Sequence, residues 1–184
     1  MTRGPGTIVL APYDPAWPAV FEEERARLQA AIGEWAADIQ HVGSTSIPGI
    51  AAKPIIDIGV ALRSFEDALY CITPLVELGY ECLGEYGIPR RIYFRRRTNT
   101  PIPGQVHNNG IGRTHQIHMY ERTHEQFVGH IAFRDYLRAH PEARREYEEL
   151  KRRLAAELDD VEAYADAKSD FVQRILSLAR EEAG

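Results

Sequence analysis

Apolar and polar residues alternate along several stretches of the chain, and this alternation predicts β-strands. The clearest case is residues 53–62, in which large apolar side chains at every second position share one face. That face carries Ile56, Ile58 and Val60. Ile55, Asp57 and Gly59 fall on the opposite face. Similar runs predict four further strands, over residues 39–43, 80–83, 90–96 and 113–121.

Between and after these runs, apolar residues recur at helical spacing and predict helices. Asp14 and Pro15 are expected to begin the first helix, as its N-cap and its first helical residue, with Glu22 to Glu24 on its solvated face. Pro141 divides two helices near the C-terminus. Three further starts are predicted by capping-box pairs, Ser64 with Asp67, Thr123 with Gln126 and Asp159 with Glu162.

The resulting order is helix, two strands, helix, three strands and three helices, which predicts an α+β fold. A mixed sheet with a C-terminal helical layer accommodates this order. At 184 residues and 44% hydrophobic composition, with no internal boundary, residues 1–184 are expected to form a single domain.

Composition limits which partners the protein is expected to bind and which cellular compartment it is expected to occupy. A formal net charge of −5 argues against binding nucleic acid by bulk electrostatics. The chain has no long apolar run and no signal-peptide core, so a soluble, cytoplasmic protein without a membrane partner is expected. Cys71 and Cys82 lack metal-ligand spacing and are expected to be free thiols. The sequence leaves the oligomeric state open.

The segment that joins the first two predicted strands is rich in small residues. Gly43 to Ser46 can present backbone N–H groups to a phosphate, and Asp57 on the next strand can hold a divalent cation beside it. An ordinary loop followed by a solvated acid would give the same pattern, and both interpretations stay open at this point.

Three segments together resemble the GrpB family. They are HVGSTSIPGIAAKPIIDI at residues 41–58, YDPAW at 13–17 and FRDYLRAHP at 133–141. The resemblance covers nearly the whole chain. It implies a nucleotidyltransferase-like fold, similar to the domain fused to some bacterial dephospho-CoA kinases.

The resemblance also implies a GS motif and metal-binding acids. By position, Gly43 and Ser44 fill the motif, Thr45 follows them on the same substrate-binding loop, and Asp57 is the first acid. Gly59 stands where the second acid is expected, and the third place falls on His118, or on Glu121 in another register. Asp57 and His118 are therefore the candidate catalytic and metal-binding residues, and Mg²⁺ or Mn²⁺ the candidate cofactor.

The polar faces of the predicted strands collect groups suited to an anionic ligand, with one acid, several cations and an imidazole on one surface. They are Asp57, Arg91, Tyr93, Arg95, Gln116, His118 and Tyr120. An exposed sheet face of alternating charge would explain Arg91 and Arg95 equally well.

Several other candidates have two interpretations each. Lys53 could reach a phosphate or be solvated, and Lys168 could enter the cleft or extend along an apolar stripe. His41 is expected to bond to backbone rather than act in catalysis. Arg134 and Arg138 are expected to form helical ion pairs rather than ligand contacts. The irregular segment 97–111 is a candidate lid.

Three functions follow. The first is an enzyme that transfers a nucleotidyl or similar group from an NTP to a small acceptor, with arginines on the phosphates and His118 as base or metal ligand. The second is a related enzyme that uses the same cleft on another anionic small molecule without metal-dependent nucleotidyl transfer, which Gly59 favours. The third is a non-catalytic module that binds a nucleotide or other anion.

Overall fold

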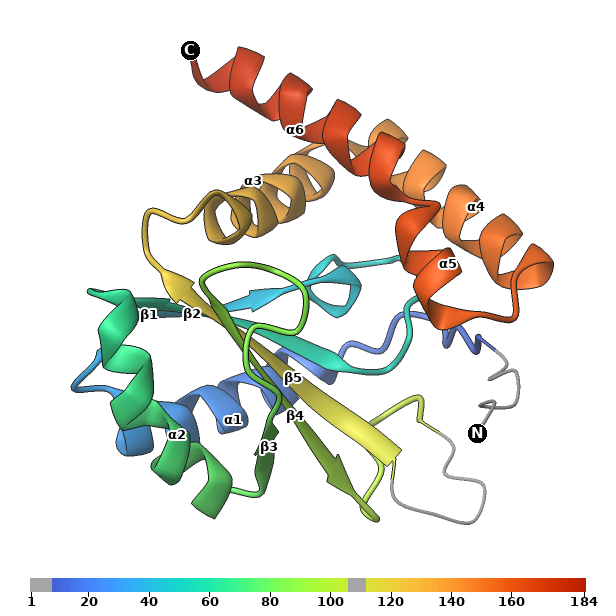
Figure 1. The fold of residues 1–184 in the computed structure, drawn as a ribbon. Coiled ribbons are helices and arrows are strands. Elements are labelled where there is room, and N and C mark those ends of the chain that lie inside the picture. The colour runs from blue at the N-terminus through green and yellow to red at the C-terminus, as the bar shows by residue number, and fades with distance from the viewer. Residues whose placement is uncertain (1–7, 106–111) are drawn as a thin grey trace.

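The computed structural model describes residues 8–105 and 112–184. In this part of the chain, five strands form one sheet, with six α-helices packed on its two faces (Figure 1). The first half of the chain contains α1 (Trp17–Ile32), β1 (Ala36–Val42), the 3-10 helix η1 (Ser44–Ser46), β2 (Ile56–Leu62), the 3-10 helix η2 (Phe65–Asp67), α2 (Ala68–Glu77) and β3 (Tyr80–Cys82). The second half contains β4 (Arg91–Thr98), β5 (Gly112–Glu121), α3 (Glu125–Ala139), α4 (Pro141–Glu157), α5 (Val161–Asp166) and α6 (Ser169–Ala183).

The sheet is mixed, as predicted, with strand order β1-β2-β5-β4-β3. The pair β2 and β5 is parallel and the other neighbouring strands are antiparallel. In the parallel pair, Asp57 lies opposite Gln116 and Gly59 lies opposite His118. The α+β fold class is therefore confirmed, and all five predicted strands exist with boundaries that differ by a few residues.

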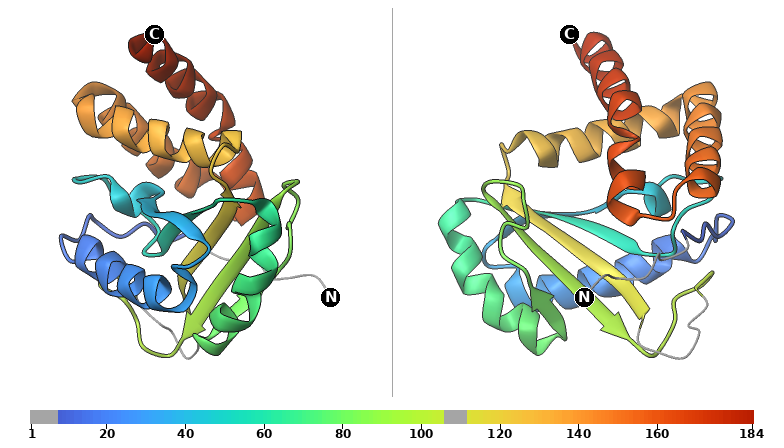
Figure 2. Two further views of the ribbon diagram at one scale, coloured as in Figure 1. Left: turned by 90° about the vertical axis from the view of Figure 1, so that its left-hand side faces the viewer. Right: turned by 45° about the vertical axis from the view of Figure 1, so that its right-hand side comes forward.

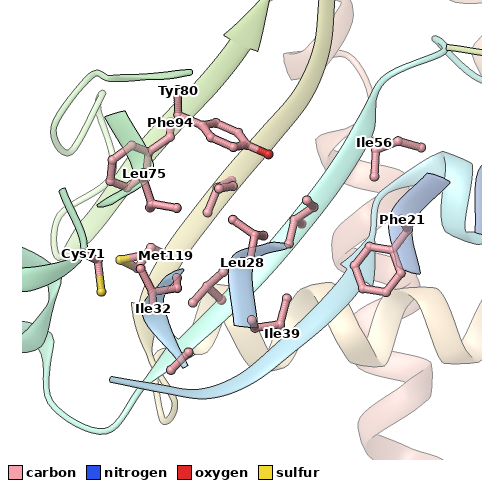
Figure 3. Packing of buried hydrophobic residues seen from close by; sticks show 14 of the residues in the cluster. Phe21, Leu28, Ile32, Ile39, Ile56, Cys71, Leu75, Tyr80, Phe94 and Met119 are labelled. Carbon is pink, nitrogen blue, oxygen red and sulfur yellow. The ribbon is translucent and has the colours of Figure 1, made fainter. Parts of the chain in front are cut away.

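Helices α1 and α2 cover one face of the sheet and enclose the main hydrophobic core. Ile56, Ile58 and Val60 point into this core, so the predicted division of β2 into an apolar and a polar face is confirmed. Figure 3 shows Leu28 and Ile32 of α1 packed with core residues of the strands and of α2. Burial of this apolar surface is the main stabilising term of the fold.

Helices α3 to α6 form a layer over the opposite face, and α3 lies next to the sheet (Figure 2). The predicted C-terminal helical layer is therefore present. It contains four helices rather than the predicted three, because the last predicted helix is divided at Ala167 and Lys168. This break places Lys168 at the start of α6, facing the space between the helices and the sheet.

Two predicted helix starts were wrong in detail because neighbouring side chains supply the cap. The ring of His124, not Thr123, accepts a hydrogen bond from the backbone N–H of Gln126. Asp160, not Asp159, caps α5 through the N–H of Ala163. The Ser64 and Asp67 capping box is confirmed.

The start of α1 also differs from the prediction. The helix begins at Trp17, and Asp14 accepts a hydrogen bond from the N–H of Ala16 one turn earlier. Glu24 was wrongly expected to be solvated. Its side chain is buried, accepts a hydrogen bond from the Tyr80 hydroxyl and pairs with Arg96 at 2.8 Å.

The predicted irregular segment is shorter than expected, since β4 extends to Thr98 and β5 begins at Gly112. Its described part, residues 99–105, packs on the start of α1. The indole N–H of Trp17 donates to the carbonyl oxygen of Pro103 at 2.9 Å, and Ile102 is buried. Residues 106–111, on which much of the lid prediction rests, lie outside the described residues.

Two further sequence predictions concern thiols and membranes. Cys71 and Cys82 are both free, as predicted, and burial raises the pKa of the Cys71 thiol to about 11. Among the helices of the described chain, none is both long and apolar enough to cross a bilayer.

Candidate functional site

Two adjoining cavities lie between the polar face of the sheet and the C-terminal helices. The larger has a volume of about 490 Å³ and the smaller about 120 Å³. Both have Asp57, Gln116 and Lys168 in their walls, so they meet at these three side chains. The smaller, which we call the lysine cavity, is lined by Ser44, Lys53, Ile55, Asp57, Gln116, Lys151, Tyr164 and Lys168. The larger, which we call the main cavity, is bounded further by residues of α3 and α6.

The loop after β1 approaches Asp57 closely because its first residue is glycine. Gly43 has φ +70°, and a Cβ atom built there would lie 2.5 Å from Asp57 Oδ2. Any other residue at this position would be strained by the left-handed backbone and would collide with the carboxylate. The predicted GS motif is therefore placed beside the predicted acid, with Ser44 in the wall of the lysine cavity.

Thr45 is on this loop but its hydroxyl is not available to a ligand. It is buried, donates to the carbonyl oxygen of Ile55 at 3.2 Å and lies 3.0 Å from His41 Nε2. His41 stacks on Phe21, and burial lowers its pKa to about 4. Thr45 and His41 thus hold the loop, and the expectation that His41 would bond to backbone was wrong.

Two arginines of α3 hold the same loop from the other side. Arg138 donates two hydrogen bonds, of 3.0 and 2.7 Å, to the carbonyl oxygen of Ser46. Arg134 donates to the carbonyl oxygen of His41 at 2.9 Å and pairs with Asp135. As expected, neither arginine lines the cavities, but both are tertiary links rather than purely helical ion pairs.

Asp57 and His118 lie together where the two cavities meet. Their Oδ1 and Nε2 atoms are 3.5 Å apart, and their side chains are 27% and 15% exposed. The predicted proximity of these residues follows from the parallel pairing of β2 and β5, which brings the two polar faces side by side. Tyr93, another predicted ligand contact, packs its ring against His118 and hydrogen-bonds to Gln116.

Lys53 and Lys168 both face the lysine cavity, so the interpretations that left them solvated or on an apolar stripe are not supported. Their ammonium groups lie 4.4 and 3.7 Å from the centre of the Tyr164 ring. Burial is the main cause of a lowered pKa for both lysines, and it brings that of Lys168 to about 8. The positive charge of Arg113 also lowers the pKa of Lys53, and the positive charge of Lys53 lowers the pKa of Lys168.

Arg91 and Arg95 lie on the predicted face of the sheet, but their guanidinium groups already bind other groups of the protein. Arg91 donates to the carbonyl oxygens of Glu85 and Tyr86, and Arg95 pairs with Glu81 at 2.7 Å. Neither residue lines either cavity. The structure therefore gives no support to a ligand-binding role for these two arginines.

The metal centre implied by the resemblance does not fit the residues present. Gly59 stands at the position of the second acid, and a Cβ atom there would lie 3.3 Å from the ring of Phe127. Glu121 lies at the end of β5, opposite Leu62, and pairs with Arg90 instead of approaching Asp57. In the described residues, no group of three or more His, Cys, Asp or Glu side chains could hold a metal ion.

Three residues of the site were missed at the level of sequence. Lys151 of α4 is buried, donates to the carbonyl oxygen of Ala51 and lies over the Tyr147 ring. Burial lowers its pKa to about 7. The ring of His130, on α3, lies edge-on to that of His118, with 5.4 Å between the ring centres. The ring of Tyr164 lies next to the ammonium groups of both Lys53 and Lys168. The spacing of Lys151 four residues after Tyr147 was a usable signal, since both fall on one helical face.

The fold and the site define an α+β protein with a mixed five-stranded sheet and a cleft formed by a glycine turn, a strand aspartate and several lysines. The family model described as GrpB protein matches residues 7–178. The chain belongs to the GrpB family, as its sequence segments suggested.

Individual relatives agree with this assignment. The crystal structure of GrpB from Enterococcus faecalis has 34% identity and a TM-score of 0.80, and the match covers 95% of this chain and 99% of that one. UPF0157 protein YqkA of Bacillus subtilis is 39% identical over 88% of this chain, which spans 44% of its length. A dephospho-CoA kinase of Mycolicibacterium paratuberculosis is 33% identical over 88% of this chain and 43% of its own length.

More distant solved structures include Cid1 poly(U) polymerase bound to MgGTP, with 15% identity, a TM-score of 0.40 and coverage of 70% of this chain and 42% of that one.

Proposed function

We propose that this protein binds an anionic small molecule in the two adjoining cavities and catalyses a proton-transfer step with Asp57 and His118, without a resident metal ion. The observation that carries the proposal is the contact between these two side chains at the place where the cavities meet. Lys53 and Lys168 supply positive charge on one side of that place.

In this proposal Asp57 is the group that exchanges a proton with the ligand. Its carboxylate lines both cavities, whereas His118 lines only the main cavity. The 3.5 Å separation between Asp57 Oδ1 and His118 Nε2 is long for a hydrogen bond. Such contacts commonly shorten when a ligand excludes water. An imidazole N–H directed at Asp57 orients the carboxylate and stabilises its charge.

Nucleotidyl transfer is the weaker candidate because of the donor set. Mg²⁺ prefers several hard oxygen ligands, and Asp57 is the single carboxylate in the described wall of the lysine cavity. Space for a second acid at position 59 is taken by Phe127. A reaction driven by positioned side chains agrees better with these residues.

The test is conversion of a mixture of small metabolites, followed by mass spectrometry. Purified wild type, Asp57→Asn and His118→Gln are each incubated with the mixture in EDTA, and again with Mg²⁺ or Mn²⁺. The expected result is a species that wild type consumes equally in EDTA and that both variants leave unchanged. The exposed variant Arg145→Ala serves as a control for loss of a side chain elsewhere.

Two outcomes would overturn the proposal. Conversion of a nucleoside triphosphate that EDTA abolishes would establish metal-dependent transfer instead. Binding without conversion of any metabolite would identify a non-catalytic module.

A further inference from the structure

The distribution of lysine in this chain is uneven in a way that singles out one cavity. The chain has three lysines and nineteen arginines, and all three lysines line the lysine cavity. They reach it from separate parts of the fold, Lys53 from the segment before β2, Lys151 from α4 and Lys168 from the start of α6. Solubility does not explain this, because arginine supplies the cationic charge elsewhere.

Lysine and arginine differ in the anions they suit. A guanidinium group is planar and matches a carboxylate with two parallel hydrogen bonds, whereas an ammonium group is a compact point charge. Three lysine side chains line the cavity from different parts of the fold, and together they suit a tetrahedral anion. The Lys151 ammonium donates one N–H to the carbonyl oxygen of Ala51 and has two more to offer, and Ser44 adds a further polar side chain to the wall. The cavity therefore favours a phosphate group over a carboxylate.

The charged side chains that line the lysine cavity are suited to a ligand with two negative charges. With its lysines protonated, the lysine cavity holds three positive charges and one negative charge, from Asp57. Glu148 lies near Lys151, but its carboxylate is outside the cavity and accepts hydrogen bonds from Arg152 and the N–H of Ala51. A phosphate monoester carries a charge of about −1.5 to −2 at neutral pH, which balances this excess.

The volumes of the two cavities indicate which part of a ligand each cavity can hold. The lysine cavity, at about 120 Å³, has room for roughly four water molecules, enough for one phosphate group and not for a triphosphate chain. The main cavity, at about 490 Å³, has the size of an ordinary ligand pocket and is partly apolar through Phe133, Val172 and Leu176. An organic group of moderate polarity fits there.

We propose that the ligand is a phosphate monoester whose phosphate group occupies the lysine cavity and whose organic part occupies the main cavity. This inference rests on the proposed function and specifies its substrate class. The phosphate is a handle that positions the molecule, and the atoms next to it lie beside Asp57 and His118, where the proton is exchanged. Because burial lowers the pKa of Lys151 and Lys168, a bound dianion restores their protons, and binding takes up protons from solvent.

The small number of lysines makes a direct experiment possible. Labelling lysine with ¹³C at Cε gives one signal for each lysine, and all three report on the same cavity. The probes are matched pairs, AMP with adenosine and glycerol 3-phosphate with glycerol, together with ATP and Mg²⁺. We expect the phosphorylated member of each pair to shift all three signals and to bind about ten- to hundredfold more tightly than its partner.

Variants separate the lysine cavity from general charge effects. Lys168→Met is expected to weaken AMP binding about tenfold or more, and Lys168→Arg should also weaken it, because the guanidinium group is too large for the cavity. Arg145→Ala removes an equal charge at an exposed position and should leave AMP binding unchanged. The wild-type titration decides the question even if a Lys168 variant fails to fold.

Each outcome has a definite meaning. Equal binding of AMP and adenosine, or binding of ATP with Mg²⁺ about tenfold tighter than that of AMP, would overturn the inference. Asp57→Asn should retain or strengthen AMP binding, because it removes the negative charge from the cavity. If phosphorylated probes bind there but no conversion depends on Asp57 and His118, the proposed function fails alone. Conversion that depends on both residues, without phosphate binding, would overturn only the substrate class.

Discussion

Replacing Gly59 with aspartate introduces the second acid that the sequence resemblance implied, and the structure predicts that this change destabilises the fold without creating a metal site. Position 59 is buried, and a Cβ atom there would lie 3.3 Å from Phe127 Cε2 and 3.4 Å from Val42 Cγ1. An aspartate needs space for three further heavy atoms in the same direction. Its carboxylate would also share the face of β2 with Asp57, which disfavours the charged form.

The magnitude follows from two costs. Overpacking a filled site costs about 1–3 kcal/mol, and burial of a polar group without a partner costs about 1–3 kcal/mol more. The expected loss is therefore about 4 kcal/mol, which for a chain of this size lowers Tm by about 8–16 °C. Gly59→Ala should be nearly neutral, because its tight contact is offset by a gain of about 0.4–1 kcal/mol from the less flexible unfolded chain.

The assay is thermal and urea unfolding followed by circular dichroism, with Mn²⁺ binding measured by calorimetry. Gly59→Asp combined with Phe127→Ala is the matched double variant, because removal of the ring opens the space that the carboxylate needs. The double variant should therefore lose less stability than the sum of the losses of the two single variants. A Gly59→Asp protein as stable as wild type that binds Mn²⁺ would refute the reasoning, since the cleft would then accommodate the metal centre.

Three further predictions concern the supports of the fold and the loop. Glu24→Ala should lower the free energy of unfolding by about 3–5 kcal/mol, because Arg96 loses its buried partner; a loss under about 1 kcal/mol in urea unfolding would contradict this. Arg138→Ala should speed amide hydrogen exchange in residues 43–46, because the carbonyl oxygen of Ser46 loses both donors, and unchanged exchange would show that the loop is held otherwise. Burial lowers the pKa of Lys151 in the folded protein to about 7, from its ordinary 10.5. Keeping the charged ammonium buried therefore destabilises the fold to its full extent below pH 7, and this destabilisation disappears as the pH rises toward 10.5. Lys151→Met should therefore gain stability relative to wild type as pH falls from about 10 to 7, by at most about 1.4 kcal/mol per pH unit, and a pH-independent difference in urea unfolding would refute the burial argument.

Much of the fold could be predicted because periodicity is a local property. Alternation along β2 assigned Ile56 and Ile58 to the core and Asp57 to the opposite face, since successive side chains of any strand point to opposite sides. The same reasoning placed His118 on the polar face of β5. Their proximity needed the further assumption that the two strands share one sheet, which the parallel pairing confirms.

The arginines of β4 show where this reasoning fails. Arg91 and Arg95 are on the expected face, yet the guanidinium group of Arg91 donates to nearby carbonyl oxygens and that of Arg95 pairs with Glu81. The prediction for Glu24 was wrong in the opposite direction. This residue belongs to a run of acids that was expected to face solvent, but it is buried and pairs with Tyr80 and Arg96. Such partners come from other elements, and no pattern within one segment identifies them.

By itself, the sequence determined the strands and most of the helices, the polar face with Asp57 and His118, and the glycine turn beside it. Tertiary structure alone decided that Lys53, Lys151 and Lys168 converge on one cavity and that Phe127 fills the place of a second acid. The physical reason is the range of the interactions. Backbone geometry sets the direction of a side chain from its nearest neighbours in the chain, whereas its surroundings depend on how distant segments pack to bury their apolar faces.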